Sequence, residues 1–289
     1  MKKWTVALSL LLALTGCASP APAEPDALPE EPPTVSATAS LPALTPLGAL
    51  TTPAEVTEGR APAEDYQLPH IPPLGPFTDD DFPVLAAELP EVDAAFYGLQ
   101  WDKALIRWGD SLAEFDWPWL TSQQILPRLY CFDLDDDRED ELIVICHPGT
   151  GTGVSVDKLH VLEKNPDGTL TDCALPWEFF REDLSEAMSV ETVNGRTYSI
   201  LGTELTDITE LLQEQEDGDP ACIEGFRFGD IVSFEVIPEP LFYGESLRFR
   251  GAAWLDGEGF HPTLSYAAEV DAAVLYQDGV FTLSQIHLS

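Results

Sequence analysis

Short apolar runs separated by turn signals make up most of the chain from residue 77 onwards. Asp-Gly and Asn-Gly dipeptides favour tight β-turns, because glycine accepts the positive φ that such turns require. Such dipeptides occur at 167–168, 194–195, 217–218, 256–257 and 278–279. Their flanks predict hairpins over 192–201 and 272–287, and residues 226–228 and 231–237 predict a third around Gly229 and Asp230. Further strands are expected at 104–108, 128–132, 142–147, 159–164, 247–253 and 264–270.

Helical patterning is confined to two segments. Residues 79–89 begin with three aspartates, which suit a helix N-terminus, although Pro83 interrupts the segment. Residues 176–188 have Pro176 at a start position, followed by acidic residues. We therefore expect a mainly β fold of antiparallel sheets and hairpins with one or two short helices.

The first seventeen residues have the pattern of an export signal. Lys2 and Lys3 precede an apolar run over 4–14 that is too short to span a bilayer, and Leu14-Thr15-Gly16-Cys17 follows. This tetrapeptide resembles a bacterial lipobox. The resemblance implies a signal peptide over 1–16, cleavage before Cys17, and a lipid on Cys17 that anchors the chain to the extracytoplasmic face of the cell membrane.

Residues 17–76 differ sharply in composition from the rest of the chain. The stretch 18–76 contains 14 of the 25 prolines and a single aromatic residue, Tyr66. Such a segment buries too little apolar surface to offset its conformational entropy. We expect a proline-rich, disordered tether over 17–76, followed by a single globular β-rich domain over 77–289.

The net charge narrows the range of partners. Fourteen Lys and Arg residues stand against 51 Asp and Glu, which gives a formal net charge of −37. Binding to nucleic acid requires a cationic surface, so nucleic acid is excluded as a partner.

An acidic hairpin is the one segment that specifies a chemistry. Asp133, Asp135 and Asp137 alternate along residues 131–146, and Glu141 follows them. This spacing directs three carboxylates toward one point, and the carbonyl of Glu139 is expected to fill a further direction, as calcium requires.

The hairpin resembles the calcium loops of FG-GAP and VCBS-type bacterial surface proteins. The resemblance implies a local calcium site formed by Asp133, Asp135, Asp137, Glu139 and Glu141. One departure matters, because Arg138 occupies the place of the usual glycine. A non-glycine residue at positive φ costs roughly 1–2 kcal/mol. The alternative is an acidic hairpin that keeps its shape without metal.

No catalytic constellation stands out in the sequence. The G-x-S-x-G and H-E-x-x-H patterns are absent. Two function classes remain open: a non-enzymatic surface module that binds an extracellular glycan, peptide or protein, and an exported hydrolase that uses acidic residues on glycan or peptide. The aromatic residues of 101–119 suit either a sugar platform or a core. The region from Tyr97 onwards also resembles surface lipoproteins of gut-type Gram-positive bacteria. That group brings no established activity, so the resemblance implies location and fold only.

Two further expectations concern single residues. His160 lies in an alternating apolar run and is expected to be a half-exposed strand residue. Four cysteines lie beyond Cys17, namely Cys131, Cys146, Cys173 and Cys222. They allow three disulfide pairings, and free thiols are the alternative.

Overall fold

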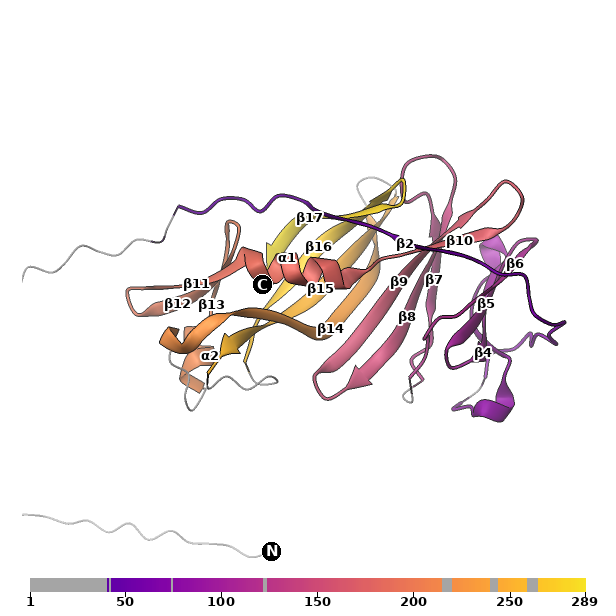
Figure 1. Cartoon of the computed structure of the whole chain (residues 1–289), viewed down its shortest axis with the longest axis horizontal. Coiled ribbons are helices and arrows are strands. Elements are labelled where there is room, and N and C mark those ends of the chain that lie inside the picture. The colour runs from indigo at the N-terminus through magenta and orange to yellow at the C-terminus, as the bar shows by residue number, and fades with distance from the viewer. Residues whose placement is uncertain are drawn as a thin grey trace, which may run out of the picture. The chain divides into compact units, whose positions relative to one another are not determined.

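The computed structural model describes residues 41, 43–73, 75–121, 124–214, 220–239, 244–258 and 265–289 (Figure 1). The expected signal peptide, Cys17 and the turn at 217–218 lie outside the described residues. The described chain is mostly strand, which confirms the expected fold class.

The strands are β1 (Leu50–Pro53), β2 (Glu55–Glu58), β3 (Val84–Leu89), β4 (Ala94–Gln100), β5 (Lys103–Trp108), β6 (Ser111–Phe115), β7 (Arg128–Phe132), β8 (Glu141–Gly151), β9 (Val154–Lys164), β10 (Leu170–Ala174), β11 (Met188–Val193), β12 (Arg196–Leu201), β13 (Glu204–Asp207), β14 (Ile223–Glu239), β15 (Gly244–Gly257), β16 (Tyr266–Gln277) and β17 (Val280–Leu288). The α-helices are α1 (Trp177–Ala187) and α2 (Thr209–Glu214), and 3₁₀ turns occur at Asp79–Asp81, Pro90–Val92 and Pro220–Cys222.

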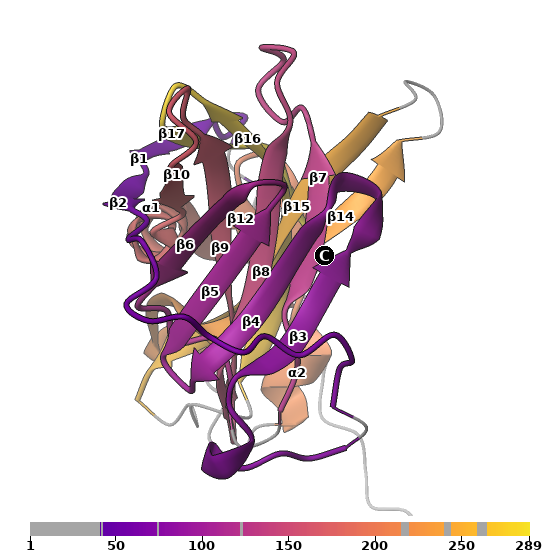
Figure 2. The same ribbon diagram turned by 90° about the vertical axis from the view of Figure 1, so that its right-hand side faces the viewer.

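The largest sheet follows the order β1-β17-β16-β15-β14-β9-β10-β2, and β8 joins it beside β9 and carries β7 on its other edge. The strand pairs are antiparallel, except for a short parallel contact between β14 and β9. A second sheet has the order β3-β4-β5-β6, and a third has the order β11-β12-β13. Figure 2 shows the four-stranded sheet in front of β7 and β8.

The middle of the large sheet is buried on both faces. On β8, Ile143 and Ile145 point into a core shared with α1, whereas Leu142 and Val144 point into a core shared with the four-stranded sheet. Successive side chains of a strand point to opposite faces, so the continuous apolar run of β8 supplies both cores. Odd-numbered and even-numbered residues of β8 therefore enter different cores.

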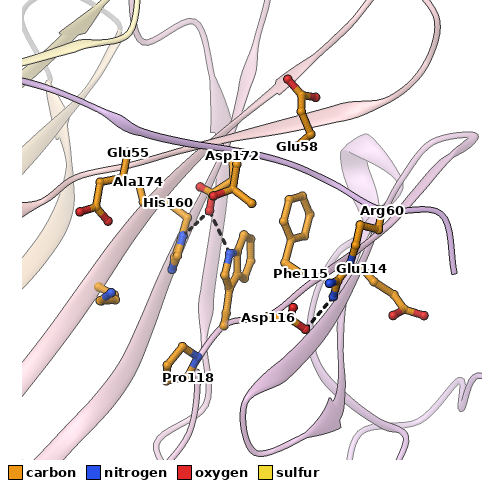
Figure 3. Close-up of a pocket in the computed structure, with 13 residues that line it drawn as sticks. Glu55, Glu58, Arg60, Glu114, Phe115, Asp116, Pro118, His160, Asp172 and Ala174 are labelled. Atoms are coloured by element: carbon orange, nitrogen blue, oxygen red, sulfur yellow. Dashed lines mark hydrogen bonds and ion pairs between the residues drawn. The ribbon is translucent and has the colours of Figure 1, made fainter. Parts of the chain in front are cut away.

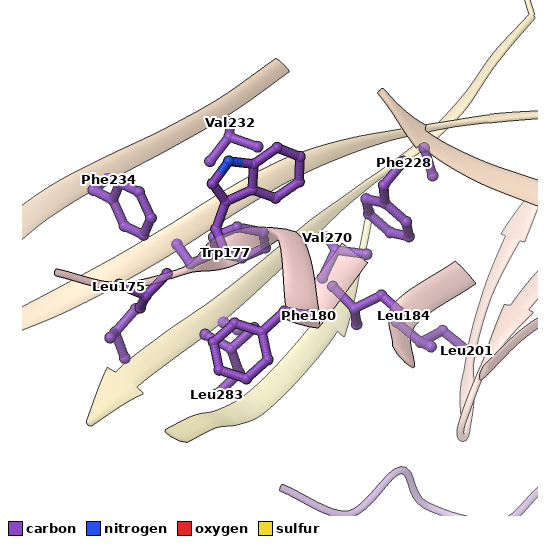
Figure 4. Packing of buried hydrophobic residues seen from close by; sticks show 14 of the residues in the cluster. Leu175, Trp177, Phe180, Leu184, Leu201, Phe228, Val232, Phe234, Val270 and Leu283 are labelled. Carbon is purple, nitrogen blue, oxygen red and sulfur yellow. The ribbon is translucent and has the colours of Figure 1, made fainter. Parts of the chain in front are cut away.

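Helix α1 covers the first of these cores. Its buried residues Trp177, Phe180 and Leu184 recur at helical spacing and form one apolar stripe. Figure 4 shows this stripe against side chains of the long strands, such as Phe234 of β14 and Leu283 of β17. The helix expected at 176–188 is confirmed.

Two of the three expected hairpins are confirmed. β11 and β12 are joined at Asn194-Gly195, and β16 and β17 are joined at Asp278-Gly279, with positive φ at all four turn residues. The third hairpin is wrong, because β14 runs straight through Gly229 with a bulge in its register opposite β15. A Cβ atom at Gly229 would overlap the indole of Trp254, so this glycine allows a close approach and makes no turn.

The helix expected at 79–89 is also wrong. Only Asp79–Asp81 make a 3₁₀ turn, in which the backbone N–H of Thr78 donates to Asp81 Oδ2 at 2.7 Å. Pro83 has no N–H to continue a helix. Residues 84–89 instead form β3, which pairs with β4 and buries Val84 and Leu85.

The expected start of the folded body at residue 77 is wrong as well. Residues 50–60, called the N-terminal arm below, contain β1 and β2, which pair with β17 and β10. The backbone of Arg60 then exchanges two hydrogen bonds with Glu114 at the end of β6. All four side chains of β2 are exposed, and no apolar pattern marks this strand. Backbone hydrogen bonds to β10 hold it, together with the hydrogen bond that Thr171 Oγ1 donates to Glu58 Oε2 at 3.0 Å. The part of the tether expectation that concerns residues 1–40 lies outside the described residues.

We predict that Gly98→Ala destabilises the protein, because a Cβ atom at this position of β4 would overlap the fully buried indole of Trp119. Overpacking of this kind costs about 1–3 kcal/mol, which a thermal or urea unfolding curve resolves. Gly225→Ala in β14 is the matched control, since nothing lies within 4 Å of the added Cβ atom. Equal stability of the two variants would contradict the packing described for Trp119.

Candidate functional site

The acidic hairpin lies between β7 and β8. Phe132 pairs with Glu141 in the last register position, so residues 133–140 form the loop. Carboxylates organise this loop: Asp137 N–H donates to Asp133 Oδ1 and to Asp135 Oδ1, both at 3.1 Å. Arg138 N–H donates to Asp133 Oδ2 at 3.0 Å. The backbone is therefore wrapped around the side chains of the first two aspartates.

Three of the predicted ligands come together. Oxygens of Asp133, Asp135 and Glu141 all lie within 4.8 Å of one another. Asp137 is not part of this group, and its Oδ1 accepts the backbone N–H of Glu139 at 2.7 Å. Glu139 is exposed, and with Asp137 it lines the adjacent cleft. The alternation of aspartates thus brings two of the three together, and Glu141 supplies the third carboxylate.

The backbone of the loop is strained where the sequence departs from the calcium-loop pattern. Arg138 has a φ of +80°, and Asp136 has a φ of +64°. Both values lie in the left-handed region that glycine adopts without cost. The strain expected at Arg138 is therefore present in the fold.

Glu141 forms the buried floor of the group. It is 5 % exposed, and its Oε2 accepts the N–H of Leu134 at 2.7 Å. Burial, followed by the nearby charges of Asp135, Asp137 and Asp133, raises the pKa of Glu141 to about 7. Burial also raises the pKa of Asp135. These carboxylates repel one another, and a cation among them would relieve that repulsion.

A cleft of about 400 Å³ opens beside the hairpin. Its wall is strongly acidic and contains one cationic side chain, Lys164. The acidic residues that line it are Asp135, Asp137, Glu139, Asp140, Glu141, Glu163 and Asp278.

A second cluster of polar residues was missed at the sequence level. His160 of β9 and Asp172 of β10 are 3 % and 2 % exposed, so the expectation of a half-exposed His160 is wrong. His160 Nδ1 lies 2.9 Å from Asp172 Oδ2, and Trp117 Nε1–H donates to the same oxygen at 2.9 Å (Figure 3). Trp117 also stacks on His160 with ring centroids 4.0 Å apart. The only sequence signal was a histidine within an apolar strand pattern.

The aromatic residues of 101–119 mostly serve the core. Trp108, Phe115, Trp117 and Trp119 are all buried, and Trp117 is stacked between Phe115 and His160. Of the two alternatives for this cluster, core packing is confirmed for these four residues.

The four body cysteines are free thiols: Cys131 and Cys222 are half-buried, and Cys146 and Cys173 are buried. Burial raises the pKa of Cys131 and of Cys173 to about 11, so both are protonated at neutral pH. No disulfide therefore cross-links the two strands of the acidic hairpin in this structure.

Comparison with known proteins gives one match. Residues 1–18 match the model of the prokaryotic membrane lipoprotein lipid attachment site, and Cys17 is the only cysteine among them. No curated protein and no solved structure matches the chain. The match supports a bacterial lipoprotein that is anchored to a membrane through lipid on Cys17. Among the residues that the structure describes, no helix is long and apolar enough to cross a membrane.

We predict that Glu141→Gln raises the melting temperature of the metal-free protein at pH 7.5. The folded-state pKa of about 7 lies above the ordinary value of 4.5, so the ionised carboxylate of Glu141 lowers the stability of the folded state. The whole of this penalty is present above pH 7. That penalty is lost as the pH falls toward 4.5, and the difference between variant and wild type should shrink accordingly. Thermal melts in EDTA from pH 5 to 8 measure it, with roughly 2–4 °C expected per kcal/mol.

Glu139→Gln is the control, because it removes one negative charge from an exposed side chain of the same hairpin and leaves the buried carboxylate of Glu141 unchanged. A Glu141→Gln variant that is less stable than wild type at every pH would contradict the repulsion described for the hairpin.

Proposed function

We propose that the chain is an extracytoplasmic, lipid-anchored surface protein whose folded body is a non-enzymatic binding module with a structural calcium site in the acidic hairpin. The convergence of oxygens from Asp133, Asp135 and Glu141 within 4.8 Å carries this proposal. Calcium takes oxygen ligands from carboxylates and backbone carbonyls in flexible geometry. The FG-GAP/VCBS-like spacing of the loop belongs to the same proposal.

The location of the hairpin suits a structural role for the proposed ion. Glu141 begins β8, and β8 contributes to both cores of the body. A cation bound by Glu141 and the first two aspartates would tie the loop to the start of this strand. Binding to the folded state alone would then stabilise the protein by mass action.

The cleft beside the hairpin is the proposed contact surface for an extracellular glycan or protein. It is lined by seven carboxylates and a single lysine, so it favours a partner that donates hydrogen bonds or carries positive charge. Calcium in the hairpin would neutralise part of this charge, which couples the ion to the choice of partner.

Calorimetric titration of the purified full-length protein with calcium tests the metal site. We expect a dissociation constant on the order of 10⁻⁴ to 10⁻³ M, the range of extracellular modules. Arg138→Gly should bind more tightly, because it removes the strain at φ +80° and a positive charge near the ion. Asp135→Ala should lose binding, since its carboxylate belongs to the converging group.

Asp140→Asn is the matched control for this titration. It removes one charge from the same loop, but its carboxylate is not part of the converging group, so binding should remain close to wild type. Absence of heat and of any thermal shift at several millimolar calcium, in the wild type and Arg138→Gly alike, would leave the hairpin without a metal role.

Metabolic labelling with a fatty-acid probe tests the anchor. The wild type should be labelled and Cys17→Ser should not, because the lipid attachment site contains no other thiol. Cys131→Ser serves as the control, since it removes a half-buried thiol of the body and should leave labelling intact. Equal labelling of Cys17→Ser and wild type would refute attachment at Cys17.

A further inference from the structure

A cavity of about 210 Å³ lies where the N-terminal arm passes from the large sheet to the four-stranded sheet. The arm contributes Glu55, Glu58 and Arg60 to its wall, and the inner strands contribute His160 and Asp172 (Figure 3). None of the calcium-hairpin residues lines this cavity. The cavity is therefore separate from the calcium hairpin.

Two buried atoms in this wall have no hydrogen-bond partner among the described residues. They are His160 Nε2 and Asp172 Oδ1, on side chains that are 3 % and 2 % exposed. Asp172 Oδ1 is an acceptor when the carboxylate is ionised, and His160 Nε2 is an acceptor when the imidazole carries its one proton on Nδ1. Asp172 Oδ1 is thus left without a donor, and a buried acceptor without a donor costs free energy.

A matched histidine–aspartate pair on the opposite face of the sheet shows what is missing. His147 Nδ1 lies 2.7 Å from Asp157 Oδ1, as His160 lies beside Asp172. The other oxygen of Asp157, however, accepts from Arg128 Nη2 at 2.7 Å and from Phe234 N–H at 3.2 Å. The protein completes one carboxylate with its own donors and leaves Asp172 Oδ1, in the wall of the cavity, without one.

The charges around the cavity specify the kind of donor that fits. Five carboxylates and two cationic side chains line it. Arg60 is neutralised by Asp116, since Arg60 Nη2 lies 2.6 Å from Asp116 Oδ1. Glu55 is exposed at the arm and makes no ion pair among the described residues. The lining is thus acidic on balance, and the unpartnered Asp172 Oδ1 is an acceptor.

A metal ion is a poorer fit than an organic cation. Among the described residues, a group of three converging donor atoms occurs at Asp133, Asp135 and Glu141 and not in this cavity. An ammonium group combines a positive charge with N–H donors for the unpartnered acceptors of the wall.

We propose that this cavity binds a small organic ammonium compound, whose N–H groups donate to the open acceptors of the His160–Asp172 pair and whose charge is balanced by the carboxylates of the arm. Trp117 Nε1–H donates to Asp172, so it reports on the charge state and contacts of that carboxylate. β2 forms one wall of the cavity, and its four side chains are exposed.

The test is a titration of the full-length protein in detergent with 1,4-diaminobutane, followed by the indole N–H signal of Trp117 in ¹H–¹⁵N spectra. EDTA is present throughout, so that calcium in the hairpin plays no part. We expect a saturable shift with a midpoint of about 1 mM or tighter. 1,4-Butanediol, which has donors but no charge, should bind more weakly, and succinate should not bind.

Three variants locate the site. His160→Phe keeps the ring that stacks on Trp117 and removes Nε2, so the saturable shift should be lost. Glu55→Gln at the exposed mouth should raise the midpoint about two- to fivefold, the value of one exposed charge pair, without affecting folding. Glu178→Gln on α1 removes an exposed glutamate away from the cavity and should behave as wild type.

The proposal is overturned by the absence of a saturable shift with the diamine, by tighter binding of succinate, or by unchanged binding in both Glu55→Gln and His160→Phe. If His160→Phe does not fold, the comparison of Glu55→Gln with Glu178→Gln decides the result on its own.

Discussion

The burial of β8, β9 and β10 on both faces is the constraint on which the rest of the structure depends. Leu159 and Val161 of β9 enter the core beneath α1, whereas His160 and Leu162 point toward the four-stranded sheet. A shift of register by one residue would exchange these sets and place polar groups in the wrong core. The alternation of side chains along these three strands therefore determines which residues face each covering layer and where the polar residues lie.

Buried polar groups within this sandwich must find partners or remain costly. Asp157 is satisfied by His147, Arg128 and a backbone N–H. Glu141 accepts the N–H of Leu134, and burial together with the nearby aspartates raises its pKa to about 7. Asp172 is satisfied at one oxygen alone. Glu141, with its raised pKa, and Asp172, with its unpartnered oxygen, lie in the two proposed binding places, as expected where stability is exchanged for function.

Local sequence signals predicted the elements whose cause is local. The hairpins at Asn194-Gly195 and Asp278-Gly279 depend on positive φ at their own turn residues, and α1 on its own apolar stripe. The strand through Gly229 could not be predicted this way, because the glycine is required by its close contact with Trp254, which lies on the neighbouring strand β15. In the hairpin, the spacing predicted Asp133, Asp135 and Glu141 correctly as a converging group, whereas Asp137 turns to the backbone of Glu139. His160 and Asp172 meet only through the pairing of β9 with β10, which no local pattern encodes.

The N-terminal arm pairs with the large sheet, contacts the four-stranded sheet and lines the cavity beside His160 and Asp172. Its composition resembles that of the segment before it, yet the stretch from Ala54 to Arg60 contains no proline and can pair with β10 and then with Glu114. The side chains of β2 stay exposed, so this part of the arm is held mainly by its backbone bonds, by the hydrogen bond from Thr171 Oγ1 to Glu58 and by the Arg60–Asp116 pair. The same residues wall the cavity that holds His160 and Asp172. A ligand that bridges the arm and this pair would add to the interactions holding the arm, and pulling on the arm from its lipid-anchored end would in turn weaken the ligand's site. By thermodynamic reciprocity, these two effects are one coupling free energy.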